Sequence, residues 1–488
     1  MQELPFTLYR AEQIKAFERC AIQDHGIAGF ELMSRAGADV FQCLQAQWPL
    51  AKTLAVFCGS GNNAGDGYVV AKLARDAGMN VCVFWLSEPE KLKGDALTAY
   101  QQYASIGGRI THFQNTQTVN ADVIVDALLG TGLDREVAGL YAQAIEVINH
   151  HPAPVLAVDI PSGLNADTGN IMGVAVKANC TVTFIGLKQG LFTGLAADYG
   201  GKICFSSLSV PDAVFDKVSA NCYRLEKKTW SPRRRCSHKG DFGHVLIVGG
   251  DFGYSGAVKL AAEAALRIGS GLVSIATRPE HAGLMNINRP ELMAHGVTHP
   301  EQITDLLLKA TVVVIGPGLG QSHWASELFT VISESGKPMV VDADALNILA
   351  KSPLQNPYWV LTPHPGEAGR LLNCSSANIQ QDRFTAARAI NARYGGISVL
   401  KGAGTLIASA DDLSISNTGN PGMASGGMGD VLSGVIGGLI AQGWPLKEAA
   451  QQGVYLHGLA ADLAADEGGE RGLLASDLMP YLRHCVNS

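Results

Sequence analysis

Short, continuous apolar runs recur along this chain, and they constrain its fold more than any other feature. In the first half they cover residues 53–57, 80–86, 122–126, 155–159, 181–185 and 202–206. In the second half they cover 244–248, 272–276, 311–315, 338–342, 358–362, 397–400 and 405–408. Continuous runs are typical of strands buried on both faces of a parallel sheet, with helical crossovers between them. The pattern predicts α/β folds in both halves.

The chain is long enough for two domains, because one hydrophobic core usually stops growing at about 250 to 300 residues and the sequence has 488. Around residues 216–237 the chain becomes polar and basic, and it includes three consecutive arginines at 233–235. We interpret this run as a solvated linker rather than a binding patch. The predicted domains are 1–216 and 238–488, with a linker at 217–237.

Composition restricts the partners and the compartment. The formal charge is -7, which disfavours a nucleic-acid partner. The first residues lack the features of a signal peptide, and no apolar run reaches the ~20 residues of a membrane span. The ten cysteines show no C-x-x-C spacing, so most are expected to be core residues in a reducing compartment. We expect a cytoplasmic protein without a nucleic-acid or membrane partner.

A glycine-rich loop at residues 58–68 follows the first apolar run and opens a predicted helix. Glycines there let the backbone approach a ligand, and free amides at a helix start attract phosphate. The loop also contains Asn62, Asn63 and Asp66, whose oxygens suit a cation or a polar substrate. A purely structural turn is the alternative.

Two further loops, at 126–136 and 159–164, follow apolar runs that end in Asp126 and Asp159. Each aspartate alone is equally compatible with a helix cap. Open α/β sheets place their sites at the carboxyl ends of strands, so three polar strand ends together favour a site. The first half is therefore expected to be a Rossmann-like, doubly wound three-layer domain with a ligand site.

These loops, with Phe-Ile-Gly-Leu-Lys at 184–188, resemble the NAD(P)H-hydrate epimerase family over about residues 1–215. The resemblance implies a potassium ion held by Asn63, Asp126 and Ser162. It also implies contacts of the hydrated cofactor with Asn62, Asn63, Ala64, Gly65, Asp66, Gly130, Thr131, Gly132, Leu133, Asp134, Arg135, Glu136, Tyr141 and Asp159. Inversion of the carbinolamine carbon requires a proton shuttle, and Asp159 is our hypothesis for it. Lys188 is interpreted either as a phosphate-neutralising group or as an exposed structural lysine.

The second half contains the sharpest motif, Asn-Pro-Gly-Met-Ala-Ser-Gly-Gly-Met-Gly-Asp at 420–430, before a small-residue helix near 430–441. Glycine amides at a helix start form a fixed hole for the charge on a transferring phosphoryl group. Asp430 is placed to take the proton of an attacking hydroxyl. A simple turn is the alternative. The Walker sequence G-x-x-x-x-G-K-[ST] does not occur, which excludes that phosphate cradle.

This motif resembles the ribokinase-like superfamily, which implies a ribokinase-like α/β domain. Its companions at 239–244, 249–251, 316–320, 342–346, 362–367 and 401–405 follow the order of the NAD(P)H-hydrate dehydratase family, over about 224–488. The resemblance implies nucleotide contacts at Lys401, Gly402, Ala403, Gly404, Thr405, Asn420, Pro421, Gly422, Met423, Ala424, Ser425, Gly426, Gly427, Met428 and Gly429. It implies substrate contacts at Ala257, Gly318, His364, Pro365, Gly366, Glu367, Ala368, Gly369, Arg370 and Asp430.

The two resemblances together imply a bifunctional enzyme that repairs the hydrates NADHX and NADPHX. The second half would phosphorylate the C6 hydroxyl and eliminate phosphate, with ADP favoured because both domains share one chain. Glu367 is expected to help hold magnesium, and the enzyme is expected to be a homo-oligomer. We interpret His364 as a site residue, and His244 and His457 as satisfied structural histidines.

Two other functions stay open at this point. The first is a ribokinase-like kinase of a small alcohol or vitamin precursor, with a noncatalytic N-terminal ligand-binding module. The second is a nicotinamide dehydrogenase, which rests only on the match of Gly59, Gly61 and Ala64 to the loose dinucleotide fingerprint.

Overall fold

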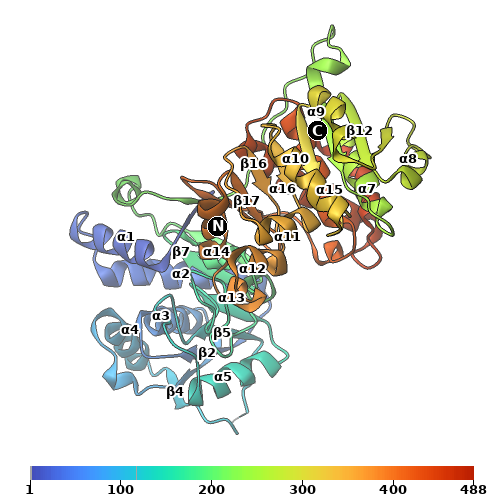
Figure 1. The fold of residues 1–488 in the computed structure, drawn as a ribbon. Coiled ribbons are helices and arrows are strands. Elements are labelled where there is room, and N and C mark those ends of the chain that lie inside the picture. Colours follow the sequence, from blue (N-terminus) through green and yellow to red (C-terminus); the bar gives the residue numbers. More distant parts are fainter. Residues whose placement is uncertain (1–2, 117, 488) are drawn as a thin grey trace. The chain divides into compact units, whose positions relative to one another are not determined.

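The apolar runs of both halves form strands in the computed structural model, which describes residues 3–116 and 118–487 (Figure 1). These strands are parallel except the one at 405–408, which is antiparallel to its neighbours. The chain divides into two compact units, Met1–Tyr223 and Arg224–Ser488. Each unit has its own sheet with helices packed around it.

The main sheet of the first unit is parallel throughout. Its spatial order is β4 (Arg109–His112), β3 (Asn80–Trp85), β2 (Thr53–Cys58), β5 (Val123–Ala127), β6 (Val155–Val158), β7 (Cys180–Phe184) and β9 (Lys202–Ser206). The order reverses between β2 and β5. At such a switch point the loops leave in opposite directions and open a crevice at the carboxyl ends of the strands.

Alternate residues of β2 belong to two different cores, as expected for a strand covered on both sides. Leu54 and Val56 pack with α2 and α3, whereas Ala55 and Phe57 pack with α5. This burial explains the unbroken apolar run at 53–57 and confirms the expected three-layer fold.

The helices of the first unit are α1 (Ala11–Gln23), α2 (Gly29–Gln47), α3 (Asn62–Asp76), α4 (Gly94–Ser105), α5 (Gly139–His150) and α6 (Ala196–Tyr199). Three short strands also pair with one another: β1 (Thr7–Tyr9), β8 (Leu187–Lys188) and β10 (Cys222–Arg224). The pairing of β1 with β8 holds Lys188 in place.

The sheet of the second unit has the same kind of reversal, between β11 and β14. Its order is β13 (Met293–Gly296), β12 (Leu272–Thr277), β11 (His244–Val248), β14 (Val312–Ile315), β15 (Met339–Val341), β16 (Trp359–Leu361), β17 (Ile397–Leu400), β18 (Leu406–Ala408) and β19 (Leu413–Ile415). The pairs from β13 to β17 are parallel, and β18 and β19 are antiparallel.

The helices of the second unit are α7 (Ser255–Arg267), α8 (Pro279–Met285), α9 (Thr304–Lys309), α10 (His323–Ser333), α11 (Ala343–Lys351), α12 (Pro365–Leu372), α13 (Ser376–Gln381), α14 (Arg383–Tyr394), α15 (Met428–Ala441), α16 (Leu446–Gly468) and α17 (Leu478–Cys485). Helix α15 is buried along most of its length. A Cβ atom at Gly434 would lie 2.0 Å from the carbonyl oxygen of Ala261 on α7, so only a glycine permits this close helix packing.

Part of the predicted linker lies against the second unit. The backbone amide of Leu225 donates to the carbonyl of Ile415 at 2.9 Å, and Trp230 packs on Trp444. The guanidinium of Arg233 lies over the ring of Phe242, 3.6 Å from its centroid. Arg233 is therefore partly engaged by the fold.

The strands that the sequence pattern did not predict lie mostly at sheet edges. The edge strands β4 and β13 are short and largely exposed, so they contain no apolar run. The long helix α2 and the buried strand β19 were also not predicted.

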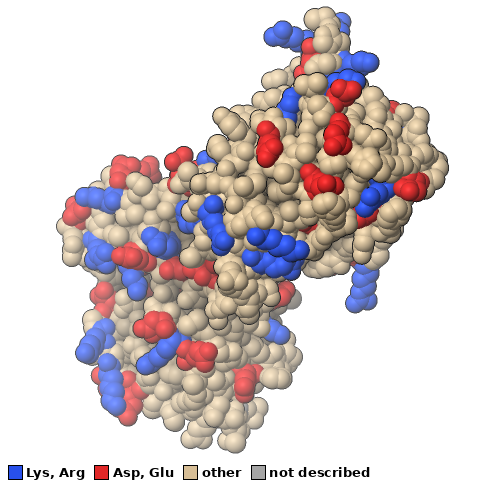
Figure 2. Space-filling model, viewed as in Figure 1, with Lys and Arg blue, Asp and Glu red and all other residues tan. Residues whose placement is uncertain are grey.

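No helix within the described residues is long and apolar enough to cross a membrane. On the face shown in Figure 2, lysine and arginine side chains are interspersed with aspartate and glutamate. Such mixing keeps the local field of either sign weak.

Candidate functional sites

The polar loops of the first unit meet at its switch point. Helix α3 begins at Asn62 directly after β2, and Asp126 lies near the end of β5. Ser162, in the loop after β6, donates from its hydroxyl to Asp126 Oδ1 at 2.6 Å and from its amide to Oδ2 at 2.8 Å. A Cβ atom at Gly130 would lie 3.5 Å from the Cβ of Asn63. The three residues predicted to hold potassium therefore come from neighbouring loops.

Asn63 and Asp126 are buried without a compensating charge. Neither amide atom of the Asn63 side chain has a hydrogen-bond partner among the described residues. Burial raises the pKa of Asp126 to about 6, although hydrogen bonds from Ser162 and Leu128 oppose the shift. Unpaired buried polar groups are costly, so this arrangement suits a cation or a polar ligand.

Asp159 is held in an unusual backbone conformation, with φ +69°. Its carboxylate accepts a hydrogen bond from the buried Lys188 ammonium, which also donates to Thr183 Oγ1 at 2.9 Å and to the carbonyl of Phe184 at 3.1 Å. A positive φ at a residue other than glycine costs energy, and such strain clusters at functional sites.

The interpretation of Lys188 as an exposed structural lysine is wrong. The chain turns sharply after β7, with φ +65° at Ile185, and brings the side chain back into the sheet end with 1% exposure. A buried ammonium needs an anionic partner, and Asp159 supplies it. A phosphate-neutralising role is not tested by this geometry.

Two more carboxyl groups are electrostatically coupled to Asp159. Burial, and then the charge of Asp159, raise the pKa of Asp66 well above its usual value and also raise that of Glu18. Asp66 was predicted as a substrate contact, but Glu18 was missed. It lies on α1, and its position in the sequence gave no signal of a site.

The remaining predicted contacts of the first unit border the same loops. The hydroxyl of Tyr141 hydrogen-bonds Ser87 Oγ at 3.0 Å and would lie 3.3 Å from a Cβ atom at Gly59. Asp134, Arg135 and Glu136 are exposed on the loop after β5.

In the second unit the glycine loop ends at the start of α15. Gly427 is the N-cap with φ +89°, and Asp430 lies in the first helical turn. Asn420 supports the loop, because its side chain accepts from the amide of Gly422 at 3.0 Å and donates to Asp462 at 2.9 Å. The first amides of a helix lack partners within it, and the helix dipole favours an anion there.

An ion pair between the half-buried Lys401 and the buried Asp342 lies next to this loop. Lys401 Nζ donates to Asp342 Oδ1 at 2.8 Å, and Ser433 Oγ donates to Oδ2 at 2.7 Å. A Cβ atom at Gly429 would lie 3.2 Å from Lys401 Nζ, which leaves little room for a side chain. The hydrogen bonds of Lys401 and Ser433 to Asp342 were not predicted, although Asp342 does end a predicted apolar run.

Asp430 is half-buried, and within the described chain its carboxylate makes no hydrogen bond or ion pair. Burial raises its pKa to about 7, the charge of Asp342 adds to this effect, and Lys401 opposes it. A carboxyl group with a pKa near neutrality is suited to proton transfer. The carboxylate of Asp430 is therefore not engaged by a structural partner within the described chain.

His364 and Glu367 cap helix α12. The Nδ1 atom of His364 accepts from the amide of Gly366 at 3.0 Å, and Glu367 accepts from the amide of His364 at 2.8 Å. Glu367 also lies 3.8 Å from Lys401 Nζ, so the cap borders the ion pair of Lys401 with Asp342.

The two histidines interpreted as satisfied differ. His244 does hydrogen-bond, to Ser274 Oγ at 2.8 Å. His457 is buried, but its Nε2 has no partner among the described residues, so that interpretation is wrong for this atom. Burial, with the charge of Lys401, lowers the pKa of His457 to about 4 and keeps it neutral.

The other predicted contacts follow neighbouring strands. A Cβ atom at Gly318, after β14, would lie 3.2 Å from the Cβ of Ala257 at the start of α7. These two residues therefore meet at the switch point of the second sheet. After β17, the amide of Gly402 donates to Thr405 Oγ1 at 3.2 Å and closes the Lys401–Thr405 turn.

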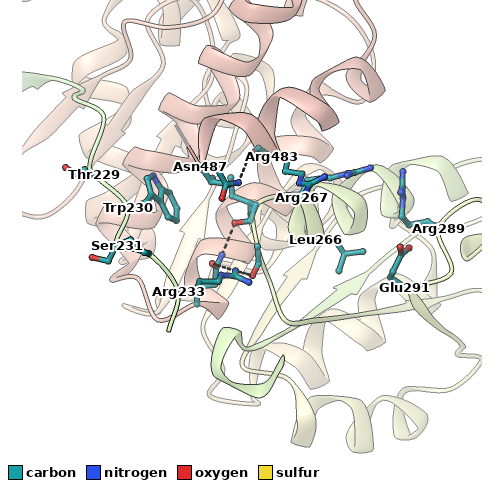
Figure 3. Close-up of a pocket in the computed structure, with 15 residues that line it drawn as sticks. Thr229, Trp230, Ser231, Arg233, Leu266, Arg267, Arg289, Glu291, Arg483 and Asn487 are labelled. Carbon is teal, nitrogen blue, oxygen red and sulfur yellow. Dashed lines mark hydrogen bonds between the residues drawn. The ribbon is translucent and has the colours of Figure 1, made fainter. Parts of the chain in front are cut away.

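A cavity of about 700 Å³ in the second unit lies elsewhere (Figure 3). Arg233, Arg267, Arg289 and Arg483 line it, and none of the predicted site residues does. Arg289 is paired with Glu263. Cavity size alone would therefore not have located the glycine-loop site.

The fold and these two sites define an α/β enzyme with a separate polar site in each unit. Residues 245–484 match the family model of NAD(P)H-hydrate dehydratase, and residues 29–190 match the model described as YjeF-related protein N-terminus. The bifunctional NAD(P)H-hydrate repair enzyme of Coxiella burnetii is 50% identical over 485 residues, 98% of this chain and 99% of the relative. The enzyme of that name from Escherichia coli is 46% identical, over 99% and 95%.

A ribokinase-like superfamily protein from Enterococcus faecalis has a solved structure with a TM-score of 0.50 and 30% identity, over 53% of this chain and 91% of that chain. Because two relatives of that name are 50% and 46% identical over nearly the whole chain, the chain belongs to the family of bifunctional NAD(P)H-hydrate repair enzymes. This confirms both expected resemblances. The full-length similarity favours this family over the kinase and dehydrogenase alternatives.

Replacing Lys401 by methionine should destabilise the second unit. Burial alone would raise the pKa of Asp342, but the charge and hydrogen bond of Lys401, together with the hydrogen bond from Ser433, help to lower it. In Lys401→Met the carboxylate stays buried without its counter-ion, which typically costs about 3–5 kcal/mol. Because its pKa then rises above the unfolded value, the penalty is full at pH 8 and shrinks as the pH falls toward 5. Urea unfolding at both pH values measures this.

The double variant Lys401→Met with Asp342→Asn is the matched control, since it removes both charges. It should recover a large part of the lost free energy of unfolding at pH 8. Equal stability of Lys401→Met and the wild type at pH 8 would contradict the proposed role of the ion pair.

Proposed function

We propose that this chain repairs hydrated nicotinamide cofactors. The first unit interconverts the R and S forms of NADHX and NADPHX, and the second dehydrates the S form with ADP. The observation that carries the proposal is the position of Asp430. It is an unpaired carboxyl group with a pKa near 7, in the first turn of the helix that follows the glycine loop.

In the second unit, Asp430 takes the proton of the C6 hydroxyl as that oxygen attacks the terminal phosphoryl group of ADP. Amides from Gly426 to Gly429 stabilise the transferring group at the helix start. The C6–O bond then breaks as phosphate leaves, C5 loses a proton and the C5–C6 double bond forms, because phosphorylation has turned a poor leaving group into a good one. The products are NAD(P)H, AMP and phosphate.

Magnesium and the nucleotide fit this part of the second unit. Magnesium is commonly held by one or two carboxylates together with substrate phosphates. Glu367 offers a buried carboxylate of that kind, with its pKa raised by burial. Glu367 would hold the ion, which supplies charge neutralisation for the phosphates. Lys401 to Thr405 and Asn420 to Gly429 would bind the nucleotide.

In the first unit, Asp159 is the proposed proton shuttle. Lys188 fixes its carboxylate, and Asp66, whose pKa burial raises well above its usual value, belongs to the same electrostatic cluster. Potassium fits Asn63, Asp126 and Ser162, because the buried amide oxygen of Asn63 lacks a partner and Asp126 lacks a counter-charge. The ion would supply positive charge beside the polar substrate. That the protein forms a homo-oligomer and that it is located in the cytoplasm both remain predictions.

Two aspartate variants should separate the two activities. Asp430→Asn should slow dehydration of the S hydrate at least about 100-fold, the lower range for loss of a general base, while R and S forms still interconvert. Asp159→Asn should do the reverse, so that only the S fraction of a mixed preparation recovers its absorbance quickly. The assay follows the recovery of absorbance of a mixed R and S hydrate preparation, first with ADP and then with ATP. The exposed Asp466→Asn is a charge-matched control, and full dehydration by Asp430→Asn would refute the assignment.

The dehydration rate should depend on pH through Asp430. A base acts only when it is ionised, so kcat/KM should fall about tenfold per pH unit below its pKa of about 7 and level off above it. Measurement from pH 5.5 to 8.5 checks this. A flat profile over that range would argue against Asp430 as the base.

Epimerisation should require potassium through Asn63. Asn63→Ala removes the unpartnered buried oxygen, so the variant should need at least about tenfold more potassium for half-maximal epimerisation, a loss of about 1.4 kcal/mol. Dehydration in the same protein is the internal control and should not change. An unchanged potassium requirement would remove Asn63 from the ion site.

A further inference from the structure

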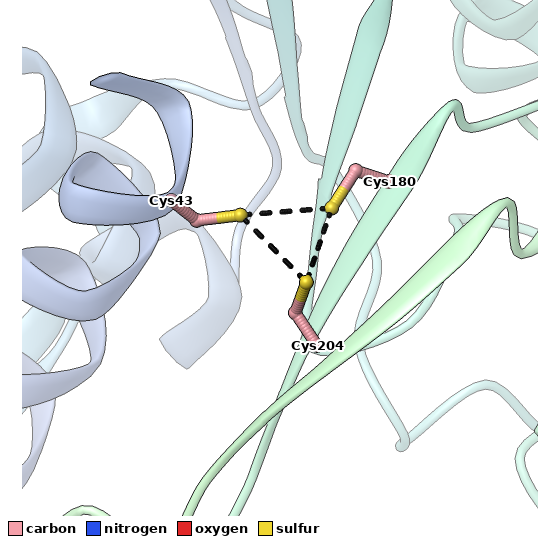
Figure 4. Close-up of side chains that lie close together, drawn as sticks. All are labelled: Cys43, Cys180 and Cys204. Atoms are coloured by element: carbon pink, nitrogen blue, oxygen red, sulfur yellow. Dashed lines mark hydrogen bonds between the residues drawn. The ribbon is translucent and has the colours of Figure 1, made fainter. Parts of the chain in front are cut away.

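Three buried thiols of the first unit converge on one point (Figure 4). The Sγ atom of Cys43 lies 3.6 Å from that of Cys180 and 3.9 Å from that of Cys204, and the last two are 3.6 Å apart. Their exposed fractions are 1%, 1% and 6%. In Figure 4 the three side chains point toward a common centre.

The backbone fixes this convergence. Cys180 begins β7 and Cys204 lies within the neighbouring strand β9, where it pairs with Val182. Because Cys180 and Val182 are two residues apart, their side chains share one face of the sheet, and so Cys180 and Cys204 do as well. Helix α2 packs on that face and brings Cys43 to them.

The triangle of sulfur atoms has the size of a metal site. Its centre lies about 2.1 Å from each sulfur, whereas a zinc–thiolate bond is about 2.3 Å, so a shift of a few tenths of an ångström would admit an ion. Small core residues would fill this space equally well, but a thiol at each of three positions supplies the ligands that soft metals prefer.

The number of ligands indicates the kind of ion. Within the described chain, no fourth cysteine, histidine, aspartate or glutamate joins this group. Soft thiolate ligands suit both zinc and monovalent copper, but structural zinc almost always has four ligands, which disfavours zinc at a site of three. We propose that Cys43, Cys180 and Cys204 form a three-coordinate thiolate site for a soft metal ion, with monovalent copper as the ion that fits best.

Such a site would act on stability rather than on catalysis. The cysteines lie on the sheet face covered by α2, whereas Asp159 and Lys188 follow the carboxyl ends of β6 and β7. Coordination would tie α2 to two strands and release the thiol protons that the metal displaces. Because the ion binds the folded state, it would raise the unfolding temperature of the protein.

The test uses the full chain with Cys236→Ser and Cys374→Ser, which removes the two exposed thiols. Reduced, metal-free protein receives monovalent copper under anaerobic conditions in competition with a chromogenic copper chelator. We expect one tightly held equivalent, a higher unfolding temperature, and three sulfur ligands by X-ray absorption. Cys43→Ala, Cys180→Ala and Cys204→Ala should each weaken binding at least 100-fold.

Cys20→Ala removes a buried thiol outside the cluster and should bind like the parent. Matching Cys→Ser variants and the epimerase rate show whether any loss arises from misfolding. Copper binding that is equal in the parent and in folded variants of the cluster would overturn the proposal. So would failure of the parent to compete with the chelator, or tighter binding of zinc with four ligands.

Discussion

A lysine held against an aspartate at the carboxyl end of a parallel sheet occurs in each unit, with one member of each pair fully buried, and both sites depend on this pair. In the first unit the pair is Lys188 with Asp159, and in the second it is Lys401 with Asp342. A parallel sheet covered on both faces leaves polar groups few places except the strand ends. A charge buried there is stable only with a partner, so each pair brings a fixed positive charge into its site.

The two pairs differ in what surrounds them. In the first unit the aspartate of the pair is itself the proposed proton shuttle, and its strained backbone orients it. In the second unit Asp342 is fully committed to Lys401 and Ser433, and the proposed base is the separate Asp430. The negative charge of Asp342 helps to raise the pKa of Asp430, while Lys401 limits the rise. Burial is the main cause of the raised pKa of Asp430, and the ion pair modulates it without a hydrogen bond to that carboxylate.

The apolar runs were sufficient to predict the central strands, because those strands are buried on both faces and show it in every residue. Edge strands such as β4 lack this signal. The motifs located both glycine loops, yet they did not reveal which side chains pair. For Lys188 the motif left both a phosphate-neutralising group and an exposed structural lysine open, whereas the turn at Ile185 brings the side chain to Asp159. Glu18 and the Cys43–Cys180–Cys204 cluster depend on residues far apart in the chain, which local spacing does not connect.

Several predicted ligand contacts also maintain the local backbone, and this couples stability to function in the second unit. His364 and Glu367 cap α12, and Asn420 caps the turn that precedes the glycine loop. Loss of a cap typically costs about 0.5–2 kcal/mol, so a variant at these positions would change loop geometry and ligand contacts together. Asp430 makes no such structural bond within the described residues. Its substitution therefore probes chemistry with the least disturbance of the fold, which is why the functional assignment depends on Asp430 rather than on the caps.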